Sequence, residues 1–242
     1  MESSSAHAMI RRAALGALLL AAACSPVKRA PPPAGVPAAP PLAAAGEVHY
    51  RIDAARSDVR ILAYRSGALA SLGHNHVLLA RSLSGDVFLP ADPARAHFEV
   101  MLPVAELVVD EPAARAAEGT DFASEPSAAD IEGTRRHMLG EGQLDAASYP
   151  RIVLSGTGAR SADGLLARTT LRVRDRSLAQ DVPLTVTVEN GVLTAQGGFT
   201  VLQSALGLTP FSVALGALKV RDDLAVRFRL VALPDPTGGA GG

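Results

Sequence analysis

Apolar and polar residues alternate along most of the chain after residue 47, which is typical of β-strands with one buried face. The alternating segments are VHYRID, DVRILAYR, LSGDVFL and HFEVMLPV in the first half, and RIVLSGTG, LLARTTLRVR, VPLTVTVE, GVLTAQGGFTVL and LAVRFRLVAL in the second. Asp163-Gly164 and Asn190-Gly191 fall between strands, where two-residue hairpin turns need positive φ angles. Short strands and tight turns without alternating helices predict a mainly β protein, an antiparallel barrel or sandwich.

Residues 110–150 break this pattern. They are rich in Ala, Glu and Arg, and Ser124 and Ser127 are available as helix N-caps. We therefore expect one or two short helices in the 110–145 insertion, lying across the sheet or a barrel end. No second linker follows, so residues 47–233 are expected to form one domain and residues 234–242 a flexible tail.

The N-terminal region has the pattern of a secretory signal peptide, assigned to residues 1–23 with Met9 as the expected true start. Arg11 and Arg12 precede a short apolar run, and small alanines follow it. The run is shorter than the ~20 residues that a membrane-spanning helix needs.

Cys24, the only cysteine, directly follows those alanines and resembles the lipidated cysteine of a bacterial lipobox. The alternative is an ordinary cleaved signal with an incidental cysteine. The resemblance implies a periplasmic protein anchored by lipid at Cys24, and Ser25 favours the outer membrane of a Gram-negative bacterium. Residues 24–46 are rich in Pro and Ala, which predicts a semi-rigid tether of ~3.1 Å per residue.

Composition excludes several classes of function. The net charge is -1 without a basic stripe, and the chain has no Trp, so we expect no nucleic-acid partner. A single cysteine allows neither an internal disulfide nor a cysteine-based zinc site. No nucleophile–histidine arrangement is visible, and Ser71 lacks the G-x-S-x-G context, so we expect no enzymatic activity.

Four segments together resemble the YceI-like family: YRIDAARSDVRILAY (50–64), RRHMLGEGQLDAASYPRIVLSG (135–156), LRVRDRSLAQDVPLTVTV (171–188) and FTVLQSALGL (199–208). The matching positions include His137, Asp145, Tyr149, Pro150 and Gly207. The resemblance implies a lipocalin-like β-barrel in the periplasm that binds polyisoprenoids or similar amphiphilic lipids.

The chain also departs from the family pattern. Arg136 replaces an Asp, Gln203 an Arg and Leu206 a Phe. GHNHV (73–77) stands where a Gly-x-Phe stretch is common. The aromatic residues that would contact a prenyl chain are therefore fewer. The resemblance predicts the fold of this chain more strongly than it predicts the ligand.

The stretch SLGHNHVLL (71–79) holds the main candidate site residues. If 72–79 is a strand, His74 and His76 share one face with Leu72 and Leu78. One hypothesis makes these four residues and His137 a ligand site at the mouth of an apolar cavity. A second has His74, His76 and His137 bind a metal ion. In a third, the pair is structural, with each imidazole satisfied by a carbonyl or by an acid such as Asp145. His49 and His97 are interpreted as isolated surface residues.

The leading functional hypothesis is a lipid-anchored periplasmic binding protein that holds an amphiphile, a prenyl lipid or a quinone, in its barrel. It requires no other cofactor. The alternatives are a metal-binding protein or metal-dependent enzyme, and a structural envelope lipoprotein with a filled barrel. Homodimerisation is left open.

Overall fold

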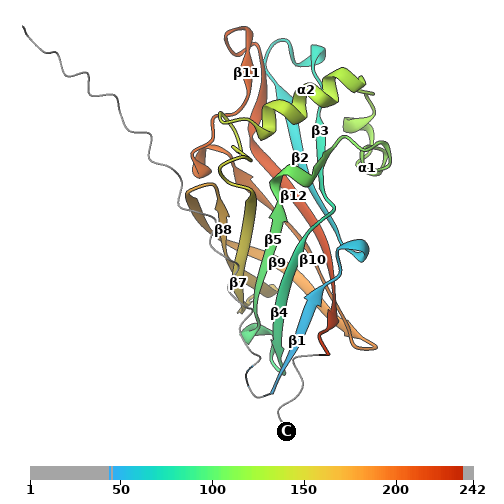
Figure 1. Ribbon diagram of the computed structural model, residues 1–242, viewed down its shortest axis with the longest axis vertical. Coiled ribbons are helices and arrows are strands. Elements are labelled where there is room, and N and C mark those ends of the chain that lie inside the picture. Colours follow the sequence, from blue (N-terminus) through green and yellow to red (C-terminus); the bar gives the residue numbers. More distant parts are fainter. Residues whose placement is uncertain (1–43, 45, 237–242) are drawn as a thin grey trace, which may run out of the picture. The chain divides into compact units, whose positions relative to one another are not determined.

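Strand pairing closes an antiparallel barrel of eight strands in the computed structural model, which describes residue 44 and residues 46–236 (Figure 1). In ring order the strands are β1 (Glu47–Ile52), β4 (Ser84–Pro90), β5 (His97–Pro103), β7 (Arg151–Ser161), β8 (Gly164–Val173), β9 (Arg176–Glu189), β10 (Val192–Leu202) and β12 (Leu218–Pro234). The end of β12 pairs with β1, at Ile52↔Ala232 and Tyr50↔Pro234. The expected mainly β, lipocalin-like barrel is confirmed.

A second set of strands extends the wall at the opposite end of the barrel. The first part of β12 pairs with β2 (Asp58–Ser66), β2 pairs with β3 (His76–Ala80), and β3 with β6 (Leu107–Val109). The short β11 (Ser212–Val213) pairs with the beginning of β12. This end, uppermost in Figure 1, is called the upper end below.

The expected helices and the β9–β10 turn are present, but the β7–β8 turn is formed by Ala162 and Asp163, because Gly164 already pairs with Ser161 as the first residue of β8. Asn190 and Gly191 have φ angles of 51° and 78°, as the β9–β10 hairpin turn requires. The insertion contains α1 (Pro112–Ala117) and α2 (Ala128–Leu139), with Ser127 as the N-cap of α2 in a capping box with Asp130. α2 lies across the upper end of the barrel (Figure 1). No described helix is both long and apolar enough to span a bilayer.

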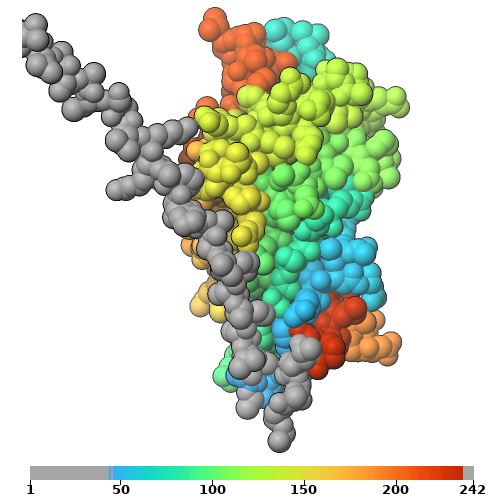
Figure 2. All heavy atoms as spheres, viewed as in Figure 1, coloured from blue at the N-terminus to red at the C-terminus, as the bar shows by residue number. Residues whose placement is uncertain are grey.

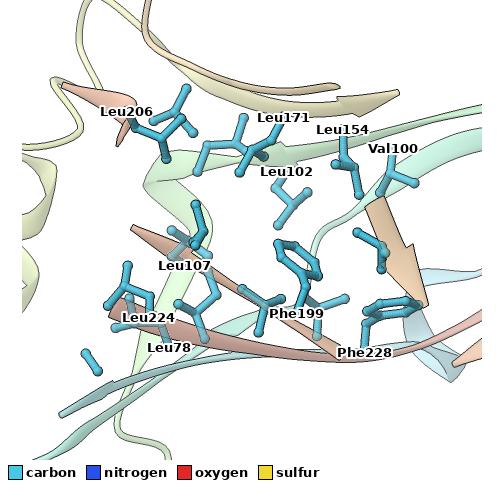
Figure 3. Close-up of a pocket in the computed structure, with 18 of the residues that line it drawn as sticks. Leu78, Val100, Leu102, Leu107, Leu154, Leu171, Phe199, Leu206, Leu224 and Phe228 are labelled. Carbon is cyan, nitrogen blue, oxygen red and sulfur yellow. The ribbon is translucent and has the colours of Figure 1, made fainter. Parts of the chain in front are cut away.

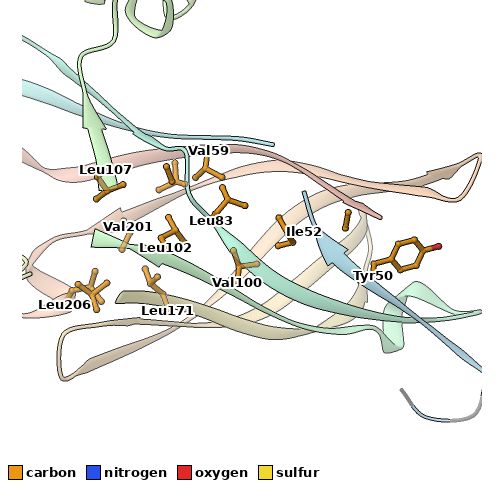
Figure 4. Packing of buried hydrophobic residues seen from close by; sticks show 14 of the residues in the cluster. Tyr50, Ile52, Val59, Leu83, Val100, Leu102, Leu107, Leu171, Val201 and Leu206 are labelled. Carbon is orange, nitrogen blue, oxygen red and sulfur yellow. The ribbon is translucent and has the colours of Figure 1, made fainter. Parts of the chain in front are cut away.

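Buried apolar side chains line the barrel interior from one end to the other, with Tyr50 and Ile52 toward one end and Leu107 and Leu206 toward the other (Figure 4). A second, smaller cluster packs between the outer face of β2 and β3 and the segment containing α1; its members are Leu62, Val77, Leu79, Ala114 and Phe122. β3 is thus buried on both faces, and the α1 segment fixes its position.

Several expectations need correction. The strand expected over 72–79 begins only at His76, because residues 70–72 form a 3-10 turn. The expected tail is structured at its start: Pro234 ends β12, and Asp235 pairs with Arg51 (2.5 Å). His49 is not a surface residue. It is buried, stacks on Phe88, and has its Nε2 2.7 Å from the Asp86 carboxylate.

His97 is not isolated either, because its ring stacks on the other side of Phe88 with a centroid distance of 4.6 Å. The signal peptide (1–23), Cys24 and all but two residues of the tether (24–46) lie outside the described residues.

Candidate functional site

The barrel encloses an apolar cavity of about 750 Å³ (Figure 3). Its walls are leucine, valine and phenylalanine side chains from strands all around the barrel, among them Leu102, Leu154, Leu171, Phe199 and Phe228. Inward positions alternate with outward ones along each strand, which explains the period of two in the sequence. A hollow interior of this size contradicts the alternative of a filled barrel.

Polar groups gather at the end of the cavity under α2. The polar side chains there are His74, His76, Asp130, Thr134, His137 and Gln143. Two further polar residues, Thr169 and Gln203, line the cavity, but each donates a side-chain hydrogen bond to a backbone carbonyl. The cavity is therefore amphipathic, with a long apolar body and one polar end.

His76 is held by a buried carboxylate that sequence reasoning did not identify. Its Nδ1 lies 2.6 Å from Asp110 Oδ2, and the Asp110 side chain is fully buried. The other carboxylate oxygen accepts hydrogen bonds from the Val77 amide (2.9 Å) and from Arg115 Nη1 (2.5 Å). Because an ionised carboxylate only accepts, His76 Nδ1 must carry a proton. In the neutral imidazole, Nε2 is then a hydrogen-bond acceptor.

His74 is positioned through Ser124 and the same arginine. Arg115 Nη2 donates to Ser124 Oγ (3.2 Å), and this hydroxyl lies 3.3 Å from His74 Nδ1. The hydroxyl has two acceptor lone pairs and one proton, so it can pair with His74 Nδ1 in either tautomer. The tautomer with the proton on Nε2 is favoured by the Asp130 carboxylate, whose Oδ2 faces His74 Nε2 at 3.9 Å. The two rings thus face their carboxylates with different nitrogens, His76 with Nδ1 and His74 with Nε2.

The environment of Asp110 keeps it ionised. Burial raises the pKa of this carboxyl, but the hydrogen bonds from His76, Val77 and Arg115 outweigh burial and hold the pKa below its ordinary value. A carboxyl with a lowered pKa stabilises the fold at neutral pH. That contribution is lost as the pH falls through the folded-state pKa.

We expect Asp110→Asn to lower the free energy of unfolding at pH 7 by about 2–3 kcal/mol, since hydrogen bonds to a charged group are lost. Asn tolerates the positive φ of residue 110 (55°), so backbone strain would not account for the loss of stability. Urea unfolding of wild type and variant from pH 7 downward checks this. The difference should shrink below the unfolded-state pKa of about 3.9, and a difference that stays constant would contradict the role of the ionised carboxylate.

The structure brings all five predicted site residues to one cavity but does not make them a metal site. His74, His76, His137, Leu72 and Leu78 all line it. His137, in the last turn of α2, contacts the Phe211 ring edge-on at 4.5 Å between centroids. Within the described residues, no group of three or more His, Cys, Asp or Glu side chains could hold a metal ion. The metal alternative, which needs the three histidines around one ion, is therefore not supported.

Comparison with known proteins shows the fold. No protein-family model and no curated sequence matches the chain. Among solved structures, it is similar to Burkholderia cenocepacia BcnA, a YceI-like barrel protein, with a TM-score of 0.55 and 18% identity over 74% of this chain and 98% of BcnA. The chain has the YceI-like barrel fold. A Campylobacter jejuni YceI protein also matches, with a TM-score of 0.43 and 13% identity over 65% of this chain and 84% of its own.

Within this YceI-like barrel, Asp110, Arg115 and Ser124 are the site residues that the sequence did not indicate. The hypothesis of a structural pair named Asp145 as an example of a partner acid, but the carboxylate at His76 is Asp110. Asp110 follows β6, whereas Arg115 is in α1 and His76 begins β3, so the three meet only in the folded chain.

Proposed function

We propose that this protein is a lipid-anchored periplasmic binding protein that holds an amphiphilic molecule in its barrel without chemically changing it. The observation that carries this proposal is the apolar cavity of about 750 Å³ with polar groups at one end. Burial of an apolar tail is favourable by ~0.8 kcal/mol per CH₂, so a prenyl tail is a suitable occupant. The signal peptide and Cys24 supply the proposed anchor and location.

The hydrogen-bonding groups of His74 and His76 limit which kinds of lipid head group would bind at the polar end of the cavity. His76 Nε2 offers an acceptor and His74 Nε2–H offers a donor, with the ring centroids 6.4 Å apart. A hydroxyl group both donates and accepts a hydrogen bond, whereas a quinone carbonyl only accepts. We therefore favour a hydroxyl-bearing lipid, a prenyl alcohol or a quinol, over the quinone.

Native mass spectrometry of residues 46–242, which contain every described strand, tests the binding function. The protein is purified from cells without chelator. We expect a mass excess that corresponds to a lipid and is lost on delipidation. A bare polypeptide mass, together with no binding of added prenyl alcohols, would contradict the proposal.

The head-group assignment has its own test. We expect geranylgeraniol to bind wild type about tenfold more tightly than its methyl ether, because one net hydrogen bond is worth about 0.5–1.5 kcal/mol. His76→Phe should remove this preference and leave the affinity for the ether almost unchanged. Equal binding of alcohol and ether by wild type would contradict the role of the histidines but not the binding function.

A further inference from the structure

Two neighbouring loops at the upper end carry exposed apolar side chains and no charge. They are SGALASLG (66–73) and TPFSVALGAL (209–218). Of the ten large apolar side chains that are exposed in the described part of the chain, five belong to these loops: Leu69, Leu72, Phe211, Val213 and Leu215. We call these five residues the apolar collar. Figure 2 shows the two loops in cyan and orange-red at the top of the molecule.

The collar is held in place by the backbone. The Leu69 amide donates to the Ala217 carbonyl at 2.7 Å, which ties one loop to the other, and β11 pairs with β12 within the second loop. Ala214 and Leu215 have φ angles of 50° and 55°, the left-handed region that is unfavourable for such residues. This strained turn leaves the Leu215 side chain fully exposed instead of packing it on the barrel.

The collar continues directly into the cavity. Leu72 and Phe211 belong both to the collar and to the cavity lining, and their loop neighbours Gly73 and Leu218 also line the cavity. Phe211 contacts His137 of α2, so the loops meet the helix at the polar end of the cavity. An apolar surface therefore runs from the outside of the protein to the inside of the barrel.

We propose that the apolar collar inserts shallowly into a lipid bilayer, so that the mouth of the cavity opens toward the acyl chains. The first charged residues next to the loops in the sequence are cations, which fits contact with the phosphates of a lipid surface. Arg65 precedes the first loop and Lys219 follows the second, and both are cationic. Lys219 is exposed and forms no ion pair with any other described residue. Cations just behind an apolar tip can reach lipid phosphates while the tip lies in hydrocarbon.

The proposed anchor permits this contact. β1 begins at the end of the barrel opposite the collar (Figure 1). Between Cys24 and Glu47 lie 22 residues (25–46), which can span at most ~3.3–3.6 Å each, or roughly 75 Å. β12 runs through 17 residues, or roughly 56 Å at ~3.3 Å per residue. The tether is thus long enough for the collar to reach the membrane that holds the anchor.

Tryptophan fluorescence tests the docking on the full chain, because the protein has no Trp of its own. Leu215→Trp places a probe in the collar, and Val188→Trp places a control probe, also at an exposed apolar position, at the opposite end. Each variant is mixed with phosphatidylethanolamine–phosphatidylglycerol vesicles, with or without phosphatidylcholine brominated in its acyl chains.

We expect the emission of Trp at position 215 to shift to the blue and to be quenched by the brominated chains, while Trp at position 188 is unaffected. No quenching at position 215, or equal quenching at both positions, would overturn the proposal. A blue shift without vesicles that rises with protein concentration would show instead that the collar binds a second copy of the chain. None of these readings depends on a bound ligand, so the proposed binding function is tested separately.

The paired variant Val213→Ser/Leu215→Ser gives a second measurement. Neither residue lines the cavity. In vesicle flotation of the full chain with Cys24→Ser, the paired variant should partition about tenfold or more weakly into vesicles, because two apolar side chains no longer enter hydrocarbon. Val48→Ser/Val188→Ser, two exposed positions outside the collar, is the matched control. Equal partitioning of the two double variants would overturn the proposal.

Discussion

Leu154→Trp is expected to abolish most of the ligand binding while leaving the barrel folded. Leu154 projects from β7 into the middle of the cavity (Figure 3). A Trp ring there occupies space that three or four CH₂ groups of a ligand tail would fill, which is worth ~2.5–3 kcal/mol or about 100-fold in affinity. Because the ring enters the cavity rather than a packed core, we expect little overpacking. Titration with geranylgeraniol measures the loss.

The matched control is Thr157→Trp, on the same strand but on its opposite, exposed face. It should bind the alcohol like wild type. Since the chain has no other Trp, the emission maximum of each variant also reports whether its ring is in an apolar or an aqueous environment. Unchanged affinity in Leu154→Trp, with a blue-shifted emission that shows its ring inside the barrel, would mean that ligands do not occupy the lumen.

The barrel was predictable from the sequence because its physical cause is local. A strand with one face toward a lumen must alternate, and β8 and β10 do so with few exceptions. The β9–β10 turn follows from Asn190-Gly191, and the start of α2 from Ser127. The predicted start of β3 was wrong. Leu72 continues the apolar alternation of the strand in the sequence, but residues 70–72 form a 3-10 helix in the structure.

The site was only half predictable, for an equally physical reason. His74 and His76 are conspicuous because two imidazoles interrupt an apolar run. Asp110 and Arg115 are ordinary charged residues in a segment rich in them, and 34 positions separate Asp110 from His76 along the chain. Asp110 and Arg115 become buried only when β3 packs beneath the α1 segment. Because an unpaired charge is unfavourable in the protein interior, the two side chains must then pair. The exposed apolar collar was not predicted, because the sequence alone does not show whether an apolar loop residue is exposed to solvent or buried against the rest of the protein.

Arg115→Met is expected to destabilise the protein more than any other single change at the site. Arg115 is buried and donates five hydrogen bonds: to Asp110, to Ser124 Oγ, and to the carbonyls of Asn75, Phe122 and Ser124. Met has a similar length but no charge, so Asp110 becomes a buried anion without its cation. Breaking a buried pair in this way costs about 3–5 kcal/mol. Thermal unfolding followed by circular dichroism should show a midpoint lower by about 10 °C.

The double variant Asp110→Asn/Arg115→Met separates the ion pair from simple packing. With both charges removed, no uncompensated ion remains, so the double variant should be more stable than Arg115→Met alone. The His76 tautomer would no longer be fixed by a carboxylate, and the preference for geranylgeraniol over its methyl ether should disappear even where the fold is regained. Additive losses in the double variant would show that Arg115 acts through packing alone. Recovered stability without head-group discrimination would show that the polar end of the cavity is oriented by the buried Asp110–Arg115 pair and not by the fold of the α1 segment alone.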